Sequence, residues 1–327
     1  MSSHTASVLM KPYEQRLPFN LDWNLLRTFM VVAEQGGITR AADYLGLRQP
    51  TISSALKRLE DTIGHRLVDR GPSHFAITEA GRILYQESRA MFEAVAQIPG
   101  LMSVAEGRVS GHVHIALTSH VVSPHFDALL ARFNSQHPDV TYSITVTESA
   151  EVLNRLRQNR STLGLCLMNR PDPTLSARVL FREYFGLFCG PRHRLFGRAN
   201  IELSELQGED SVSFQTDVEG GSLHSVTQLR ELALLKPKLK GVSANLPEVL
   251  RMIVTGIGVG ALPVHVARRD VEAGQLWQLP PYVALPVVDV FFVTNPQRSL
   301  NPAERILVQA LNDMLDEVPL AERCYLD

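Results

Sequence analysis

A strip of hydrogen-bonding side chains is predicted on one face of the segment that begins at Gln49. Gln49, Pro50, Ser53, Ser54 and Lys57 stand at offsets of 0, 1, 4, 5 and 8 residues, a spacing that places them together on a helix. The opposite face would carry the apolar residues Ile52, Leu56, Leu59 and Ile63. Amide, hydroxyl and ammonium groups donate to or accept from base edges, so the exposed strip suits the major groove of DNA.

Shorter segments on either side must position this helix. Residues 21–35 and 39–45 have the apolar spacing of a longer and a shorter helix, and Gly46 is expected to end the second. Helix, short helix, glycine-containing turn and helix is the order of a helix-turn-helix. Residues 67–69 and 75–77 follow as two short strands and predict a wing.

The same segment resembles the LysR-type transcriptional regulators. The matches in register are Leu25, Phe29, Ala33, Thr39-Arg40-Ala41-Ala42, Leu45, Gln49-Pro50-Thr51-Ile52-Ser53, Leu56-Lys57, Leu59-Glu60, Gly64, Leu67, Arg70, Thr78 and Gly81. The resemblance implies that the base-reading positions are Gln49, Pro50, Thr51, Ser53 and Ser54. It also implies that Arg70 in the wing contacts the DNA backbone or minor groove, and Arg40 and Lys57 complete the predicted DNA-binding set.

Three positions depart from the family pattern. Arg48 stands where the family has a capping Ser or Thr, Gly37 replaces a Ser, and Val68 replaces a Phe. The missing cap costs about 1 kcal/mol, and a cation meets the positive end of the helix. A salt bridge from Arg48 to a DNA phosphate would offset this cost. For Lys57 taken alone, a solvated surface role remains an alternative to base contact.

A linker of residues 79–107 follows, with Thr78 as the expected cap of a long helix. Its apolar residues are spaced for pairing with a partner helix, and they are Ala80, Ile83, Leu84, Met91, Ala94, Val95 and Ile98. Pro99-Gly100 is expected to end or bend the helix near Ile98. The resemblance implies a dimer seam here, in a homodimer or homotetramer. The alternative is that Met91 and its neighbours pack on the sensing domain of the same chain.

From residue 108 onward, strand-like and helix-like segments alternate, as in parallel α/β sheets. The predicted strands are residues 112–117, 141–146, 163–167, 184–190, 211–214, 239–242 and 287–293. The predicted helices are residues 123–134, 151–158, 223–234, 246–254 and 303–315. Two α/β subdomains, about 108–184 with 285–327 and about 185–284, resemble periplasmic solute-binding proteins. The expected organisation is therefore an N-terminal extension (1–20), an all-α winged helix-turn-helix (21–78), the linker helix and an effector-binding domain (108–327).

Polar residues gather at the predicted carboxyl ends of these strands, where such sheets bind ligands and helix N-termini face anions. The predicted effector-binding residues are Thr118, Ser119, His120, Ser149, Phe214, Gln215, Ser243 and Asn245. Because they are mostly polar and uncharged, we expect a small organic anion, a carboxylate, as the effector. The alternative is that Thr118 and Ser119 merely cap a helix. Gly164 replaces an Asp of the family, so a family-typical contact is not expected there.

The composition restricts the class of protein. With 327 residues the chain is long enough for two or three domains, and 45% hydrophobic with 20% charged residues is typical of globular proteins. A net charge of -2 makes no general case for nucleic acid, so DNA binding depends on local geometry. Three cysteines without paired spacing favour a reducing compartment. Because residues 1–18 lack an apolar signal and no membrane-length run occurs, a cytoplasmic location without a membrane partner is expected.

Other sites are weaker interpretations. Gly256, Gly258 and Gly260 imitate a dinucleotide fingerprint, but here a helix precedes them and a strand follows, the reverse of that motif. A metal site at His112, His114, His120 and His125 stays an alternative, although no metal or other cofactor is expected. Without a GxSxG, HExxH or P-loop motif, no enzyme activity is expected, the alternative being that the sensing region turns over its ligand. RNA polymerase stays open as a partner beside duplex DNA and the effector.

Overall fold

A computed structural model of the chain describes residues 21–71, 74–96, 98, 102, 108–217 and 221–326. Contacts divide the chain into two units, Met1–Ile98 and Pro99–Asp327. The predicted extension at residues 1–20 and the predicted interruption at Pro99-Gly100 lie outside the described residues. Each unit is a separate body with its own core.

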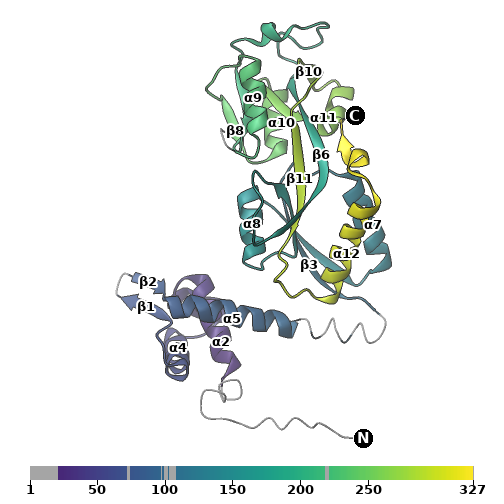
Figure 1. The fold of residues 1–327 in the computed structure, drawn as a ribbon. Helices are drawn as coiled ribbons and strands as arrows, with labels where there is room; N and C mark the ends of the chain where they lie inside the picture. The colour runs from purple at the N-terminus through teal and green to yellow at the C-terminus, as the bar shows by residue number, and fades with distance from the viewer. Residues whose placement is uncertain are drawn as a thin grey trace, which may run out of the picture. The chain divides into compact units, whose positions relative to one another are not determined.

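The first unit is a winged helix-turn-helix, as expected (Figure 1). Its elements are α2 (Trp23–Gln35), α3 (Ile38–Leu45), α4 (Gln49–Ile63), β1 (Val68–Gly71), β2 (His74–Ile77) and α5 (Glu79–Ala96). The Asp22 carboxylate accepts from the Asn24 amide at 2.9 Å and caps α2. The helices α2, α3 and α4 end at glycines in the left-handed conformation, which costs glycine no side-chain clash.

Apolar faces of the three helices form the core of this unit. Leu26, Phe29, Ile52, Leu56 and Leu59 are fully buried. The wing is joined to this core because the Glu60 carboxylate accepts from the amides of Leu67 and Val68, at 2.9 and 3.3 Å. Val68, which stands where the family has a larger residue, is itself buried.

The long helix α5 begins as predicted. The Thr78 hydroxyl accepts from the Gly81 amide at 3.0 Å, which satisfies one of the unpaired N–H groups of the first turn. The helix then continues through 18 residues to Ala96.

The second unit has two α/β subdomains. Subdomain I contains β3 (Gly111–Leu117), β4 (Val140–Val146) and β5 (Leu163–Leu167), with α7 (Pro124–Gln136) and α12 (Pro302–Glu317) on one face and α8 (Ser149–Arg157) on the other (Figure 1). Subdomain II contains β7 (Ser211–Phe214), β8 (Gly241–Ser243), β9 (Val259–Pro263), β10 (Trp277–Leu279), α9 (His224–Leu232), α10 (Leu246–Val254) and α11 (Val264–Glu272). Short 3-10 helices are present at Leu203–Leu206 and Leu320–Arg323.

Two long antiparallel strands connect the subdomains. They are β6 (Ser176–Cys189) and β11 (Val287–Thr294), and the sheet order is β4-β3-β5-β11-β6-β9-β7-β8. The predicted crossing strand, residues 184–190, was too short, because charged residues interrupt the apolar pattern in the first half of β6. Arg182 pairs with Asp289 on β11 at 2.7 Å, so its charge is compatible with a strand position. The elements α11, β10 and the short β12 (Cys324–Tyr325), which pairs with β6, were not predicted.

Among the residues that the structure describes, no helix is long and apolar enough to cross a membrane.

Candidate DNA-binding and effector sites

The outer face of α4 carries the predicted DNA-binding residues. Gln49, Pro50, Thr51, Ser54 and Lys57 are exposed, and Ser53 is half-buried. The inner face is fully enclosed, since Ile52, Leu56 and Leu59 have no exposed area. Within the described chain, Lys57 makes no ion pair. The surface of α4 is therefore polar, accessible and held by a rigid core on its other side.

The start of α4 has no side-chain cap. Arg48 occupies the N-cap position and makes no capping hydrogen bond, as the sequence predicted. Pro50 in the first turn has no N–H to satisfy. The positive end of the helix dipole therefore lies beside the exposed Arg48 side chain, and together they form a position that suits an anion.

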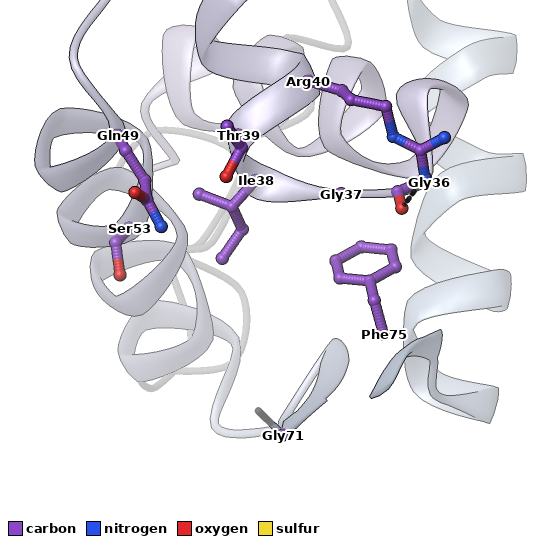
Figure 2. A pocket seen from close by; sticks show the side chains of 9 residues that line it. All are labelled: Gly36, Gly37, Ile38, Thr39, Arg40, Gln49, Ser53, Gly71 and Phe75. Carbon is purple, nitrogen blue, oxygen red and sulfur yellow. Dashed lines mark hydrogen bonds between the residues drawn. The ribbon is translucent and has the colours of Figure 1, made fainter. Parts of the chain in front are cut away.

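A hollow of about 600 Å³ lies between the starts of α3 and α4 and the wing. Figure 2 shows Thr39 from α3, Gln49 and Ser53 from α4, and Phe75 from the wing around it. The Arg40 side chain also lines the hollow, but its guanidinium bends back and donates to the Gly36 carbonyl. Arg70 lies on β1 opposite Phe75, and its side chain is outside the described residues.

The predicted effector residues come from four strand ends, and several meet between the subdomains. The Ser119 hydroxyl of subdomain I donates to the Ala244 carbonyl at 3.1 Å and accepts from the Leu246 amide at 2.9 Å, both in subdomain II. Ser119 thus caps α10, whose own N-cap residue Asn245 makes no side-chain cap. Beside it, Ser243 accepts from the Gln215 amide at 3.2 Å through its carbonyl and from the Asn245 amide at 3.1 Å through its hydroxyl.

Other predicted effector residues are engaged inside the protein. Phe214 is 3% exposed and packs edge-on against His120 and Phe185. Ser149 is buried, and its hydroxyl accepts from the Leu167 amide at 3.2 Å. The Thr118 hydroxyl lies 3.3 Å from His120 Nε2.

The alternative that Thr118 and Ser119 act as a helix cap holds for Ser119, which caps α10, whereas the Thr118 hydroxyl lies beside His120. Ser123 caps α7, because its hydroxyl accepts from the Phe126 amide at 3.3 Å.

The sequence analysis missed two polar residues behind this cluster, Glu183 on β6 and His265 on α11. Glu183 is fully buried, with one carboxylate oxygen 3.9 Å from His120 Nε2, and neither oxygen has a hydrogen-bond partner in the described parts of the chain. Burial raises the pKa of Glu183 well above its usual value, and burial together with nearby His265 lowers the pKa of His120 to about 4. His265 Nε2 donates to the Val122 carbonyl at 3.0 Å and bridges the subdomains. The sequence signal that could have identified Glu183 is a charged residue next to the apolar run of a predicted strand.

This buried carboxyl predicts a pH-dependent stability. Because the pKa of Glu183 is raised on folding, its stabilising contribution is present below about pH 4.3 and is lost as pH rises through the folded-state pKa. We therefore expect Glu183→Gln and the wild type to have the same unfolding temperature near pH 4. Toward pH 9 the variant should unfold at a higher temperature than the wild type. Calorimetry of the second unit's transition measures this, with the exposed Glu272→Gln as control. A constant difference at all pH values would show that Glu183 does not titrate in this way.

The four histidines of the alternative metal site do not meet at one point. His112 lies within 2.8 Å of the hydroxyls of Thr141 and Ser143, and His125 lies 2.8 Å from the Tyr325 hydroxyl. Across the described ranges, no group of three or more His, Cys, Asp or Glu side chains is arranged to hold a metal ion. Cys166 and Cys189 are buried, and burial raises the pKa of each thiol to about 12.

The chain combines a winged helix-turn-helix with a two-subdomain α/β unit. This combination is typical of DNA-binding regulators that also carry a ligand-binding domain. Comparison with known families agrees. The family model described as "Bacterial regulatory helix-turn-helix protein, lysR family" matches residues 23–82, and "LysR substrate binding domain" matches residues 106–316. The chain belongs to the LysR family of transcriptional regulators, a family of regulators and not of enzymes.

The similarity to known regulators extends over most of the chain. The HTH-type transcriptional regulator CysL of Bacillus subtilis is 26% identical over 76% of this chain and 82% of its own length. The SDS degradation transcriptional activation protein of a Pseudomonas species is 26% identical over 86% and 92%, respectively. The HTH-type transcriptional regulator CfxR of Cupriavidus necator is 28% identical over 85% and 87%.

Solved structures share the fold. A full-length OxyR variant of Pseudomonas aeruginosa has a TM-score of 0.61 at 18% identity, covering 94% of this chain and 99% of its own. Full-length CbnR in complex with its target DNA has a TM-score of 0.63 at 19% identity, covering 90% and 100%. Full-length LysG of Corynebacterium glutamicum with bound effector Arg has a TM-score of 0.57 at 20% identity, covering 91% and 99%.

Proposed function

We propose that α4 reads an operator in the major groove and that a small organic anion between the subdomains controls this binding. The observation that carries the proposal is the division of α4 into a fully buried apolar face and an accessible polar face. In this arrangement Gln49, Pro50, Thr51, Ser53 and Ser54 face bases. Lys57 extends this strip along α4, and Arg70 supplies the wing contact to the DNA backbone or minor groove. A DNA contact by Arg40 requires its guanidinium to leave the Gly36 carbonyl.

Footprinting with the purified full chain tests the DNA-binding part of the proposal. The substrate is a set of genomic fragments, including the region upstream of the protein's own gene, at moderate salt. We expect protection of two half-sites whose spacing is about one helical turn of DNA or a multiple of it, because two paired winged helix-turn-helix domains present two copies of α4. Uniform binding without a protected sequence would overturn the assignment of α4 as a reading helix.

Pairing of two chains is proposed through α5. Among its side chains, Ile83 and Val95 are exposed although they are large and apolar, which supports cover by a partner helix. Sedimentation of the full chain measures whether a homodimer or homotetramer forms.

The proposed domains are the winged helix-turn-helix at residues 21–78, the linker helix at 79–107 and the effector-binding domain at 108–327. The proposed location is the cytoplasm, and RNA polymerase is proposed as a further partner.

The effector part of the proposal rests on the contacts between the subdomains. Ser119 supplies the missing cap of α10, and α8 begins at Ser149 in the other subdomain, so two helix N-termini start among the predicted residues. In the first turn of α10 the Leu246 amide is already bonded to Ser119 and residue 247 is a proline, so the N-terminus of α8, which has no side-chain cap, is the one that favours a carboxylate. LysG has the same fold and was solved with an effector, which supports a ligand for this unit as well. A thermal-shift screen in which only neutral or cationic compounds stabilise the chain would contradict an anionic effector.

Ser119→Ala tests this site directly. The change removes a hydroxyl that bonds to both Ala244 and Leu246 across the subdomains. We expect at least about 10-fold weaker binding of any stabilising organic acid, which corresponds to about 1.4 kcal/mol for a lost hydrogen-bonding group. Isothermal titration measures the affinity. Ser135→Ala is the matched control, because its exposed hydroxyl donates only to the Arg132 carbonyl. Equal affinities in both variants would place the acid elsewhere.

A further inference from the structure

Arg298 is a buried cation with unused hydrogen-bond donors. It lies just before α12 in subdomain I, and its side chain is only 9% exposed. One nitrogen, Nη2, donates to Glu304 at 2.7 Å. Nε and Nη1 are also buried and have no hydrogen-bond partner among the described residues. Since buried N–H groups of proteins are almost always paired, the N–H groups of these two nitrogens require an acceptor.

Glu304 already accepts three hydrogen bonds, and none of them comes from Nε or Nη1 of Arg298. It accepts from the Thr162 hydroxyl, from the Asn301 amide at 2.8 Å and from Arg298. Asn301 and Glu304 also form the capping box of α12, so the Glu304 side chain is held in place by its own helix.

The surroundings of Arg298 carry an excess of positive charge. Thr162 also accepts from the His114 amide at 3.0 Å, and its neighbour Ser161 accepts from Arg155 Nε at 3.2 Å. Arg155, the backbone of His114 and, through Glu304, Arg298 are thus all linked to the adjacent residues Ser161 and Thr162. In the part of the chain that the structure describes, Arg155 has no carboxylate partner, and its hydrogen bond to Ser161 leaves its charge uncompensated.

The effect of this charge is visible on His114. Burial lowers its pKa, and so do the charges of His112, Arg298 and Arg155, while Glu304 acts in the opposite direction. His114 itself is exposed to solvent.

We propose that subdomain I holds a second anion site, formed by Arg298, Arg155 and His114, that takes a tetrahedral oxyanion such as phosphate or sulfate. The planar donor groups of arginine side chains suit the several oxygens of such oxyanions. Ser161 and Thr162 stand immediately before β5, whereas Thr118 follows the end of β3. Since these strands are parallel, the second site lies at the opposite end of the sheet from the proposed effector site.

Titration of the full chain with inorganic phosphate tests the site, at an ionic strength held constant with sodium chloride. We expect saturable binding of one phosphate per chain and a rise in the pKa of His114, followed by NMR of its ring protons. Arg155→Gln should weaken binding at least 10-fold without unfolding the protein, because Arg155 is on the rim. Arg298→Gln should abolish it. Arg132→Gln, an exposed arginine on α7, is the control for lost charge and should bind normally.

The failures of this proposal and of the effector proposal are distinguishable. Ser119→Ala should leave phosphate binding unchanged. If Ser119→Ala loses phosphate and Arg155→Gln keeps it, the anion occupies the site between the subdomains and the second site is wrong. If wild type shows no saturable binding beyond the chloride background, water alone satisfies Arg298 and the proposal fails.

Discussion

Ser54→Glu is expected to weaken operator binding at least about 100-fold, or about 2.7 kcal/mol, while thermal unfolding stays unchanged. Ser54 is exposed in the middle of the polar face of α4, so a glutamate fits there without disturbing the core. In the proposed complex its carboxylate would enter the field of the DNA phosphates, and like charges brought together in an interface cost several kcal/mol. Gel retardation on the footprinted fragment, with calorimetry in parallel, measures both quantities.

Gln136→Glu is the matched control for this prediction. It adds the same single negative charge at an exposed position on α7 of the second unit. We expect its operator affinity to be close to that of the wild type, because α7 is not part of the proposed DNA-reading surface. If Ser54→Glu bound as well as Gln136→Glu, the outer face of α4 would not lie in the groove.

Gly81→Ala is expected to destabilise the first unit by about 2 kcal/mol. A Cβ atom at this position would lie 2.1 Å from the Leu67 carbonyl oxygen and 2.7 Å from a methyl carbon of Ile77. Such overpacking costs about 3 kcal/mol or more, and the better helix propensity of alanine returns only about 1 kcal/mol. The clash therefore outweighs the gain. For a domain of this size we expect the transition of the first unit to fall by about 10 °C in calorimetry.

The same substitution should also lower DNA affinity, because α5 must move away from the wing to make room. Gly37→Ala is the control in the same unit: its added Cβ would meet only Arg40, at 3.5 Å, and its backbone is extended. We expect a change within about 0.5 kcal/mol for Gly37→Ala. If both variants unfold at the wild-type temperature, α5 does not pack closely on the wing in solution.

Local signals account for most of the secondary structure and for the polar face of α4. Helix periodicity and glycine stops depend on residues a few positions apart, so the bounds of α4 and the cap at Thr78 follow from neighbouring residues alone. The strands β5 and β7 were likewise predicted at their observed bounds, because short apolar runs between polar turns are strand signals. The first half of β6 was not predicted as a strand, since its arginines find their partners far away in the chain: Arg178 pairs with Asp316 and Arg182 with Asp289.

The contacts that give these elements a role depend on residues far apart in the chain. Ser119 meets Ala244 across 125 positions, and Thr162 meets Glu304 across 142. Whether Glu183 is buried or Arg298 keeps unpaired donors depends on which strands and helices surround it, and no local pattern contains that information. The order of residues therefore determined that this chain has a winged helix-turn-helix with a polar face on α4 and a two-subdomain α/β unit. Only the tertiary structure decided which polar groups meet, because burial and charge pairing are properties of neighbours in space.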